Sequence, residues 1–579
     1  MLRSISNIPK DRVYFSLITL VGLLRFVNLD FLDLQAWDEA LYAVRAEGIL
    51  RFGSWVDQSS FSIDGLYSAL HPPLYVWLTT FSFAIFGVTE FAARLFSTVF
   101  GGLTLLAIYQ IGKRISDAEV GLLAALLYGL NPFVAFFARQ GQFDAALVFF
   151  LTLSVLAVIA ALDGSKIRYT LASGAAVGGA LMTKLFVGFG IPLSYGIWMA
   201  FQRADQRRSH MKILGVCLTV AALVALPWHV YMTLIHGTGD PLFFLTSSAL
   251  VERTFWGVEG NIKSLEIFYF INQLIVLFPA GIVWFGFGLF RELRDRGSAW
   301  FFLGVWFLVF FIIFSIVRTK LAVYSLPMLV PASLIAAKVL REIVEGHHSA
   351  RTFALMVSGT AFSVLWASSQ LWRNVTKSIA ASLLRLQLPL WTDTLIIVPF
   401  VIIAAGIALF LVYSLRGTWI ERWRKPLPYL LLGPSFAICS YHLFVLDTSQ
   451  YKDGATELMQ FVRQTVPSRI VVAGYERNPQ LTYYFEGADI GWNDEISLRR
   501  IIPPKERGLF RSWLMDEVAR EPDDALVIVE KDKFVRYENV TVEEVIPPDY
   551  ALVFESRRYA AFRRTKPTQL AHISPGALP

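Results

Sequence analysis

Long apolar runs dominate this sequence and leave few choices of fold. Stretches long enough to cross a bilayer as a helix recur about thirteen times before residue 447. They lie at 12–29, 92–112, 119–137, 145–162, 169–183, 185–201, 211–235, 264–289, 299–317, 320–341, 351–369, 394–414 and 428–446. Only 17% of the residues are charged, against about 25% in a soluble protein. The sequence therefore predicts an α-helical polytopic membrane protein.

The distribution of Lys and Arg predicts how these helices are oriented. The most basic short connections, such as 202–212 and 338–351, fall on the side of the N-terminus, which the positive-inside rule places in the cytoplasm. A spanning segment at 71–86 would invert this arrangement, so we interpret 71–86 as juxtamembrane. Residues 30–91 and the chain after residue 446 are then expected outside. The net charge of +7 fits topology and anionic lipids better than a nucleic-acid partner.

The composition changes after the last apolar run. Short β-rich runs at 469–474, 525–529 and 550–554 predict strands, and 454–465 and 505–520 read as helices. We expect a transmembrane domain over residues 1–446, with an outer loop at 30–91, and a small α/β domain over 447–579. The two cysteines, Cys217 and Cys439, lie in apolar runs and predict no disulfide framework.

Polar side chains gather on the predicted outer side, at the ends of many spans. Charged groups at membrane depth are costly, so their concentration on one face predicts a shared water-filled site. The candidates are Asp38, Glu39, Tyr42, His71, Arg94, Arg139, Asp144, Lys184, Glu252, Arg253, Arg318, Lys320 and Tyr324.

This mixture of acids and cations suits group transfer from a lipid-linked phosphate. A carboxylate such as Asp38 can accept the proton of an attacking hydroxyl or amine. Several cations can stabilise the charge that develops on a departing phosphate. A second acid, Asp144, can bind sugar hydroxyls.

Several motifs together resemble the C-type membrane glycosyltransferases. Asp-Glu-x-x-Tyr-Ala at 38–43 is similar to the acidic signature in their first outer loop, and His-Pro-Pro-Leu at 71–74 to a second motif. Within them, the chain resembles the branch of the lipid A aminoarabinose transferase and the bacterial relatives of protein mannosyltransferases. Further similarity lies at 91–94, 143–144, 182–184, 226–228, 251–252 and 320–324.

The resemblance implies a polyprenyl-phosphate sugar as donor, used outside the bacterial cytoplasmic membrane with inversion at the anomeric carbon. Asp38 would be the base, and His71, Arg94 and Lys184 would lie near the donor phosphate. The acceptor would be an envelope lipid or glycan.

The resemblance to the family does not by itself imply a metal site in this chain. The aminoarabinose transferases have Val-Glu-His, with the His binding zinc, where this chain has Val-Glu-Arg at 251–253. His71 and Glu252 stay as candidate ligands for a divalent metal, and no cofactor is firmly expected.

Other interpretations of the same residues remain open. Asp38 and Glu39 can cap a helix, Arg94 and Arg139 can anchor span ends at the interface, and a protein Ser or Thr can replace the lipid acceptor. A polytopic lipid or solute transporter would also have many spans, but its charges are expected near the midplane. A scaffold that binds a partner would leave Asp38 unexplained.

Overall fold

The computed structural model describes most of the chain up to residue 367 and parts of the rest. The described residues are 9–35, 38–63, 65–163, 167–237, 268–349, 351–364, 366–367, 425–426, 433, 454–465, 467–473, 479–484, 497–501, 515–516, 518–531 and 546–565. The predicted spans at 394–414 and 428–446 lie almost entirely outside these residues. The chain divides into two compact units, the first formed by 1–27, 70–75 and 96–445, and the second by 28–69, 76–95 and 446–579.

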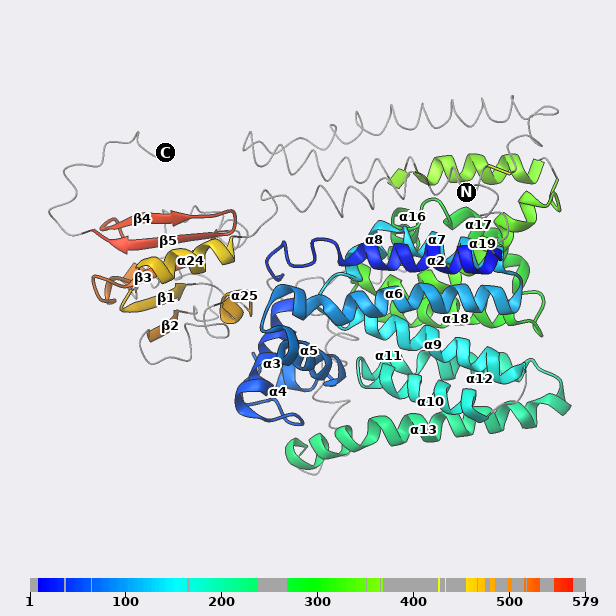
Figure 1. Cartoon of the computed structure of the whole chain (residues 1–579), viewed down its shortest axis with the longest axis horizontal. Helices are drawn as coiled ribbons and strands as arrows, with labels where there is room; N and C mark the ends of the chain where they lie inside the picture. Colours follow the sequence, from blue (N-terminus) through cyan, green and yellow to red (C-terminus); the bar gives the residue numbers. More distant parts are fainter. Residues whose placement is uncertain are drawn as a thin grey trace. The chain divides into compact units, whose positions relative to one another are not determined.

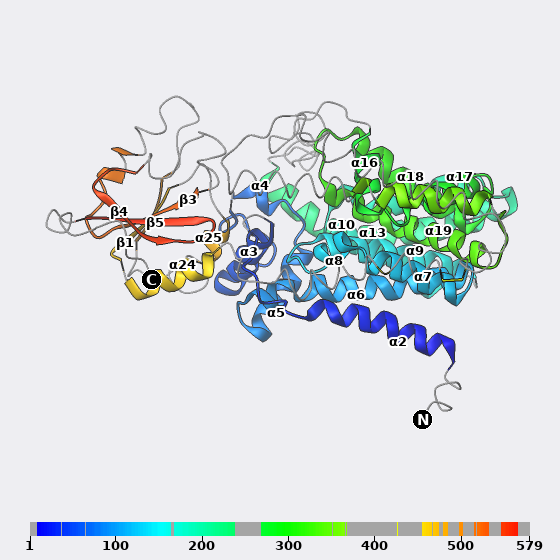
Figure 2. The ribbon, with the colours of Figure 1, turned by 90° about the horizontal axis from the view of Figure 1, so that it is seen from above.

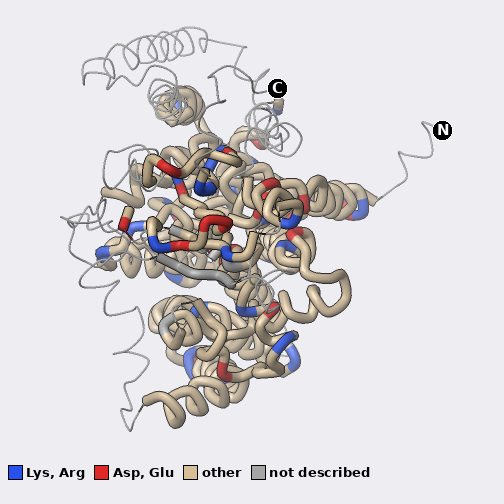
Figure 3. Tube along the Cα trace, turned by 90° about the vertical axis from the view of Figure 1, so that its left-hand side faces the viewer, with Lys and Arg blue, Asp and Glu red and all other residues tan. Residues whose placement is uncertain are grey.

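The first unit is a bundle of helices that run roughly side by side (Figure 1). Its helices are α2 (Lys10–Leu23), the larger part of α6 (Glu90–Ile115), α7 (Ala118–Gly129), α8 (Pro132–Phe137), α9 (Asp144–Leu162), α10 (Ile167–Leu181), α11 (Leu185–Gly188), α12 (Gly190–Ala200), α13 (Ala204–His236), α16 (Tyr269–Leu277), α17 (Ile282–Glu292), α18 (Ala299–Ile316) and α19 (Leu326–Val344), with the 3-10 turn η3 (Ala322–Ser325) before α19. Along the described chain as a whole, most of the Cα trace is uncharged, with Lys, Arg, Asp and Glu scattered along it (Figure 3).

Five segments of the described chain are long and apolar enough to cross a membrane. They are Glu90–Ile115, Asp144–Leu162, Ala204–His236, Ala299–Ile316 and Ala322–Val344. Two of the predicted spans are instead divided at a proline. The run at 119–137 divides where the Asn131 side chain accepts hydrogen bonds from the N–H groups of Phe133 and Val134, with Pro132 at the first helical position. The run at 264–289 divides between α16 and α17, at a segment containing Pro279.

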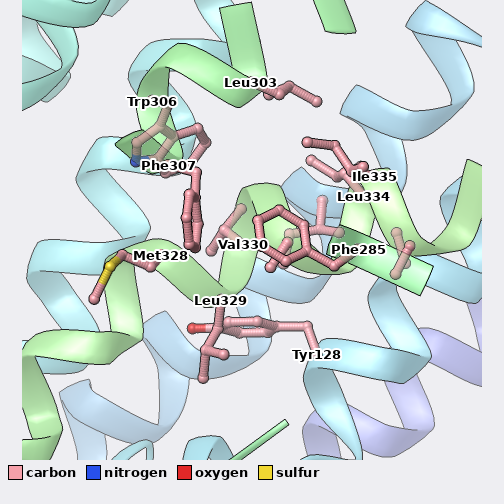
Figure 4. Packing of buried hydrophobic residues seen from close by; sticks show 14 of the residues in the cluster. Tyr128, Phe285, Leu303, Trp306, Phe307, Met328, Leu329, Val330, Leu334 and Ile335 are labelled. Atoms are coloured by element: carbon pink, nitrogen blue, oxygen red, sulfur yellow. The ribbon is translucent and has the colours of Figure 1, made fainter. Parts of the chain in front are cut away.

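Helix α19 is the centre of the first unit, packed against α7, α9, α17 and α18. Its Met328, Val330 and Leu334 are fully buried, and Figure 4 shows them packed among large side chains of α17 and α18. The rings of Phe285 and Phe307 lie 4.4 Å apart there. Close packing of this kind holds the ends of α9, α18 and α19 in fixed positions.

The second unit contains a five-stranded mixed sheet with strand order β2-β1-β3-β5-β4. Its strands are labelled in Figure 1, and Figure 2 shows β1, β3, β4 and β5 from above. The strands are β1 (Arg469–Ala473), β2 (Ser497–Ile501), β3 (Leu526–Glu530), β4 (Tyr550–Glu555) and β5 (Tyr559–Arg564). Strands β2 and β3 pair with β1 in parallel, and β5 pairs antiparallel with β3 and β4. The apolar strand β3 is buried throughout, as expected of a central strand. The unit also includes helix α24 (Ala455–Thr465) and the short helix α25 (Pro479–Thr482).

The second unit also contains the early part of the chain that the sequence assigns to an outer loop. This part holds α3 (Asp38–Phe52), α4 (Leu66–Ala69), most of α5 (Leu74–Phe86) and the first residues of α6. Helix α5 has 13 residues, so it is about 20 Å long and shorter than a bilayer core of about 30 Å. Its length agrees with the juxtamembrane interpretation of 71–86. Helix α25 packs against α3 within this unit.

Candidate functional site

Lys184 lies at the centre of a small cluster in the first unit. It follows α10 and occupies the extended N-cap position of α11, so the helix is interrupted at the lysine. Its ammonium nitrogen lies 3.7 Å from an Asp144 carboxylate oxygen. It also lies 4.8 Å from the ring centre of Phe143 and 4.7 Å from that of Tyr324. Two aromatic faces and one carboxylate therefore hold this cation.

The partners of Lys184 come from distant parts of the sequence. Phe143 and Asp144 begin α9, and Tyr324 belongs to η3, where it stacks on Phe314 with ring centres 4.8 Å apart. His71 meets the ring of Phe143 edge-on at 6.5 Å. The structure thus brings together four of the predicted residues, namely His71, Asp144, Lys184 and Tyr324.

The His-Pro-Pro-Leu motif is tied to the same place through the backbone. The N–H of Leu74 donates to the carbonyl of Met182, two residues before Lys184, at 3.2 Å. Proline has no N–H of its own, so Leu74 supplies the first backbone donor after the two prolines. This bond fixes the chain that carries His71 beside the chain that carries Lys184.

The Lys184 cluster combines charge with partial exposure. The Lys184 side chain is 23% exposed, and that of Asp144 is 10% exposed. An ammonium held at 3.7 Å from a carboxylate still has hydrogen-bonding capacity for a second anion. The cluster can therefore bind a phosphate oxygen at Lys184 and a hydroxyl at Asp144.

Lys320 lies in the same unit but has a different environment. Its buried ammonium donates to the carbonyls of Phe314, Ser315 and Val317 at 2.9, 2.6 and 2.5 Å. These carbonyls belong to the end of α18, where backbone acceptors lack helical partners. A lysine ammonium has three N–H donors, and all three are occupied here. Lys320 thus caps α18 immediately before η3 and Tyr324.

Arg139 and Arg318 are two further candidate cations in the described part of the first unit. The guanidinium of Arg139 donates to the carbonyl of Val27 at 2.6 Å, which joins two span ends. Arg318 is exposed. Glu252 and Arg253 lie outside the described residues.

In the second unit, Arg94 and Glu39 form a buried ion pair that we call the Arg94 clasp. The Nε and one terminal nitrogen of Arg94 each donate to a carboxylate oxygen of Glu39 at 2.9 Å. The remaining donors reach the carbonyls of Leu29, Leu32 and Asp33 at 2.9, 2.7 and 2.9 Å. A guanidinium has five N–H donors, and this geometry uses all of them.

Asp38 begins helix α3 and stands next to the clasp. Its side chain is exposed, whereas Glu39 is fully buried. The N–H of Gln35 also donates to Glu39, at 2.8 Å. The clasp therefore holds the first turn of α3, where an ionised carboxylate is favoured by the helix dipole. The proximity of Asp38 to Lys184 stays a prediction.

Tyr42, one turn further along α3, is buried, with the Arg45 guanidinium 6.0 Å from its ring centre. Burial lowers the pKa of Arg45 to about 10, which leaves it charged at neutral pH.

The described residues contain no group of three His, Cys, Asp or Glu side chains close enough to share a metal ion. Glu252, one of the two candidate ligands, is outside that part of the chain.

The sequence alone does not single out several of the contact residues. Phe143 entered only as part of a motif, although its ring faces Lys184. Asp33, Glu90, Gln480 and Tyr484 were not named, although all four take part in the hydrogen bonds that fix the chain before α3. The acidic residues near the first span could have indicated Asp33 as a contact residue. Nothing in the local sequence distinguishes Tyr484 from other tyrosines.

Comparison with known proteins shows what this chain is similar to. The family described as dolichyl-phosphate-mannose-protein mannosyltransferase matches residues 70–231. An undecaprenyl phosphate-alpha-4-amino-4-deoxy-L-arabinose arabinosyl transferase of Pseudomonas fluorescens is 28% identical over 53% of this chain, and the match spans 55% of its own length. A transferase of the same name from Pseudomonas paraeruginosa is 28% identical over 70% of each chain.

Solved structures show the same fold. The crystal structure of ArnT from Cupriavidus metallidurans bound to undecaprenyl phosphate aligns with a TM-score of 0.62 and 19% identity, covering 95% of this chain and 97% of ArnT. The archaeal oligosaccharyltransferase AglB from Archaeoglobus fulgidus aligns with a TM-score of 0.51 and 14% identity, covering 90% of this chain and 70% of AglB. The predicted resemblance is confirmed: the chain has the fold of the C-type membrane glycosyltransferases and is similar in sequence to their aminoarabinose-transferase branch.

Proposed function

We propose that this protein is a glycosyltransferase that moves a sugar from a polyprenyl-phosphate donor to an envelope lipid or glycan. The Lys184 cluster is the observation that carries the proposal, because it offers a cation for the donor phosphate beside an acid for the sugar. The similarity to transferases named for undecaprenyl phosphate-linked aminoarabinose supports this class of donor. So does the match to a family named for dolichyl-phosphate-mannose.

The proposed reaction is a single displacement with inversion. The oxygen or nitrogen of the acceptor forms a bond to the anomeric carbon as the bond from that carbon to the phosphate oxygen breaks. Asp38 takes the acceptor proton, and polyprenyl phosphate leaves with its negative charge stabilised by Lys184. Asp144 binds sugar hydroxyls, and His71, Arg139, Arg318, Glu252 and Arg253 are proposed to line the donor and acceptor paths.

Three residues are proposed to act by holding others in place. Arg94 and Glu39 pair with each other, and Arg94 also donates to backbone carbonyls. They position the first turn of α3 and hence Asp38. Lys320 caps α18 and positions the turn that carries Tyr324. These roles differ from the donor contacts that the sequence suggests.

The proposed location is the bacterial cytoplasmic membrane, crossed by about thirteen helices. The N-terminus is placed in the cytoplasm, and the part after residue 446 outside, by the distribution of Lys and Arg in short connections. The division into residues 1–446 and 447–579 belongs to the same proposal.

Acceptor-dependent release of polyprenyl phosphate tests the proposal. Purified protein in lipid discs should release it from a polyprenyl-phosphate sugar only when an acceptor is added, and lipid, glycan and peptide acceptors are compared in separate arms. Asp38→Asn should abolish release while donor binding persists, whereas Asp30→Asn, at another exposed aspartate of the same unit, should not. Turnover with the peptide alone would favour a protein acceptor, and transport of intact donor without release would favour a transporter.

A further inference from the structure

The segment that leads to α3, residues 28–35, is gripped by residues from the far end of the chain. We call it the pre-α3 segment. The carboxylate of Asp33 accepts hydrogen bonds from the N–H groups of Gly454 and Ala455 at 3.0 and 3.1 Å, and from the hydroxyl of Thr456 at 2.5 Å. Asp33 therefore caps α24, although more than 400 residues separate them in sequence.

The next residue, Leu34, is held at both of its backbone polar groups. Its N–H donates to the hydroxyl oxygen of Tyr484 at 3.2 Å, and its carbonyl accepts from the Gln480 side-chain amide at 2.6 Å. Leu34 and Gln480 are fully buried. A buried backbone group without such a partner is strongly unfavourable, so these two side chains fix the course of the chain at Leu34.

Tyr484 also joins this segment to the start of α6. Its hydroxyl donates to the carboxylate of Glu90 at 2.7 Å while it accepts from Leu34. Burial and the nearby Glu90 raise the pKa of Tyr484 well above its ordinary value, so the phenol keeps the proton that it donates. Glu90 and Arg94 are one helical turn apart on α6. Arg94 donates directly to carbonyls of the pre-α3 segment, whereas Glu90 is joined to the segment through the Tyr484 hydroxyl.

Gln480 is itself held by the sheet. Its side-chain oxygen accepts a hydrogen bond from the hydroxyl of Tyr559 on β5. The helix that carries Gln480, α25, packs directly on α3. The contacts thus run without interruption from β5 through Gln480 to Leu34, four residues before Asp38.

We propose that the C-terminal part of the chain is a positioning element for Asp38, and that Asp33, Gln480 and Tyr484 are its positioning residues. The inference rests on the proposed function for the role of Asp38. Small displacements of a reacting group cost about 100-fold in rate. Loosening these contacts should therefore lower kcat while the donor KM, set by other residues, stays nearly unchanged.

The test compares two tyrosines of the same unit. Tyr484→Phe removes the hydroxyl that bridges Leu34 and Glu90. Tyr550→Phe is the matched control, because its buried hydroxyl donates to the Val518 carbonyl and does not contact the pre-α3 segment. Full-length protein in lipid discs is used for acceptor-dependent release of polyprenyl phosphate and for hydrogen exchange of residues 28–35.

Tyr484→Phe should lower kcat by about 10- to 100-fold, with the donor KM within about twofold. It should also speed exchange in residues 28–35, whereas Tyr550→Phe should do neither. Asp33→Ala should behave like Tyr484→Phe, and Asp33→Asn should recover part of both readouts, because an amide oxygen can still cap α24. The Asn variant keeps the test usable if the Ala variant does not fold.

Equal exchange and equal kcat in the two tyrosine variants would overturn the inference, as would faster exchange without any loss of kcat. Wild-type protein that releases no polyprenyl phosphate under any condition would instead overturn the proposed function. In that case the exchange measurement still decides whether the C-terminal part holds the pre-α3 segment.

Discussion

The molecule contains two ion pairs among its candidate residues, one in each unit, and they are built in opposite ways. In the Arg94 clasp the two ions meet at 2.9 Å with side chains 6% and 0% exposed. In the Lys184 cluster they meet at 3.7 Å with side chains 23% and 10% exposed. The first pair uses every donor of its cation internally, whereas the second leaves a cation near solvent between two aromatic faces. Charge alone therefore does not identify a residue that binds a ligand. The number of its N–H donors that already bond within the protein does.

The largest expected effect is on the stability of the Arg94 clasp. Glu39→Gln or Arg94→Leu leaves one buried group without its ionic partner, which should lower the free energy of unfolding by about 3–5 kcal/mol. Thermal unfolding in detergent measures this. Lys10→Ala, which removes the exposed pair with Glu119, serves as control and should cost no more than about 1 kcal/mol. Clasp variants that match the control would show that the pair does not hold the fold.

Lys184→Met should affect chemistry instead of stability. We expect turnover to fall by about 100-fold, equivalent to about 2.7 kcal/mol of transition-state stabilisation, because the departing phosphate loses its cation. Thermal unfolding should change little, since the side chain is partly exposed. Steady-state kinetics together with melting curves separate the two effects. A variant that unfolds early but turns over normally would assign Lys184 to structure.

Lys320→Met should lower stability and leave turnover nearly unchanged, which is the reverse of Lys184→Met. The size of the effect should also be smaller. Three carbonyls at the end of α18 lose their donor, which should lower stability by about 1.5–3 kcal/mol. Turnover measured well below the melting temperature should stay within about fivefold of wild type. If turnover drops as far as in Lys184→Met, then Lys320 acts on the donor directly.

The smallest effect is expected at Tyr324, which contacts Lys184 through its ring. Tyr324→Phe keeps the ring and should leave turnover nearly unchanged. Tyr324→Leu removes a cation–π contact worth about 0.5–1 kcal/mol and should reduce turnover by about two- to fivefold. Equal losses in the Phe and Leu variants would mean that the hydroxyl matters and the ring does not.

Hydropathy predicted the uninterrupted helices closely but not the interrupted ones. The runs at 145–162 and 299–317 match α9 and α18 within a residue or two. The run at 119–137 does not, because Asn131 and Pro132 end one helix and begin another inside an apolar stretch. Strands β2 and β5 were missed because their sequences are short and rich in Arg, and only pairing with β1, β3 and β4 makes them strands.

The sequence identified which residues belong to the candidate site better than it identified the groups that those residues contact. His71, Asp144, Lys184 and Tyr324 were named and do come together. The environments of Arg94 and Lys320 depend on carbonyls that only the folded backbone brings within reach. Asp33 and Tyr484 depend on contacts across more than 400 residues, for which no local pattern exists.

Ligand-induced stabilisation by polyprenyl phosphate tests the central claim most directly. A ligand that binds the folded state raises the melting temperature with its concentration, so the measurement needs no acceptor and no knowledge of the sugar. We predict a clear rise for wild type and for Lys320→Met, and a rise lost or shifted to at least about tenfold higher concentration for Lys184→Met. An unchanged response in Lys184→Met would contradict the assignment of this lysine to the donor phosphate.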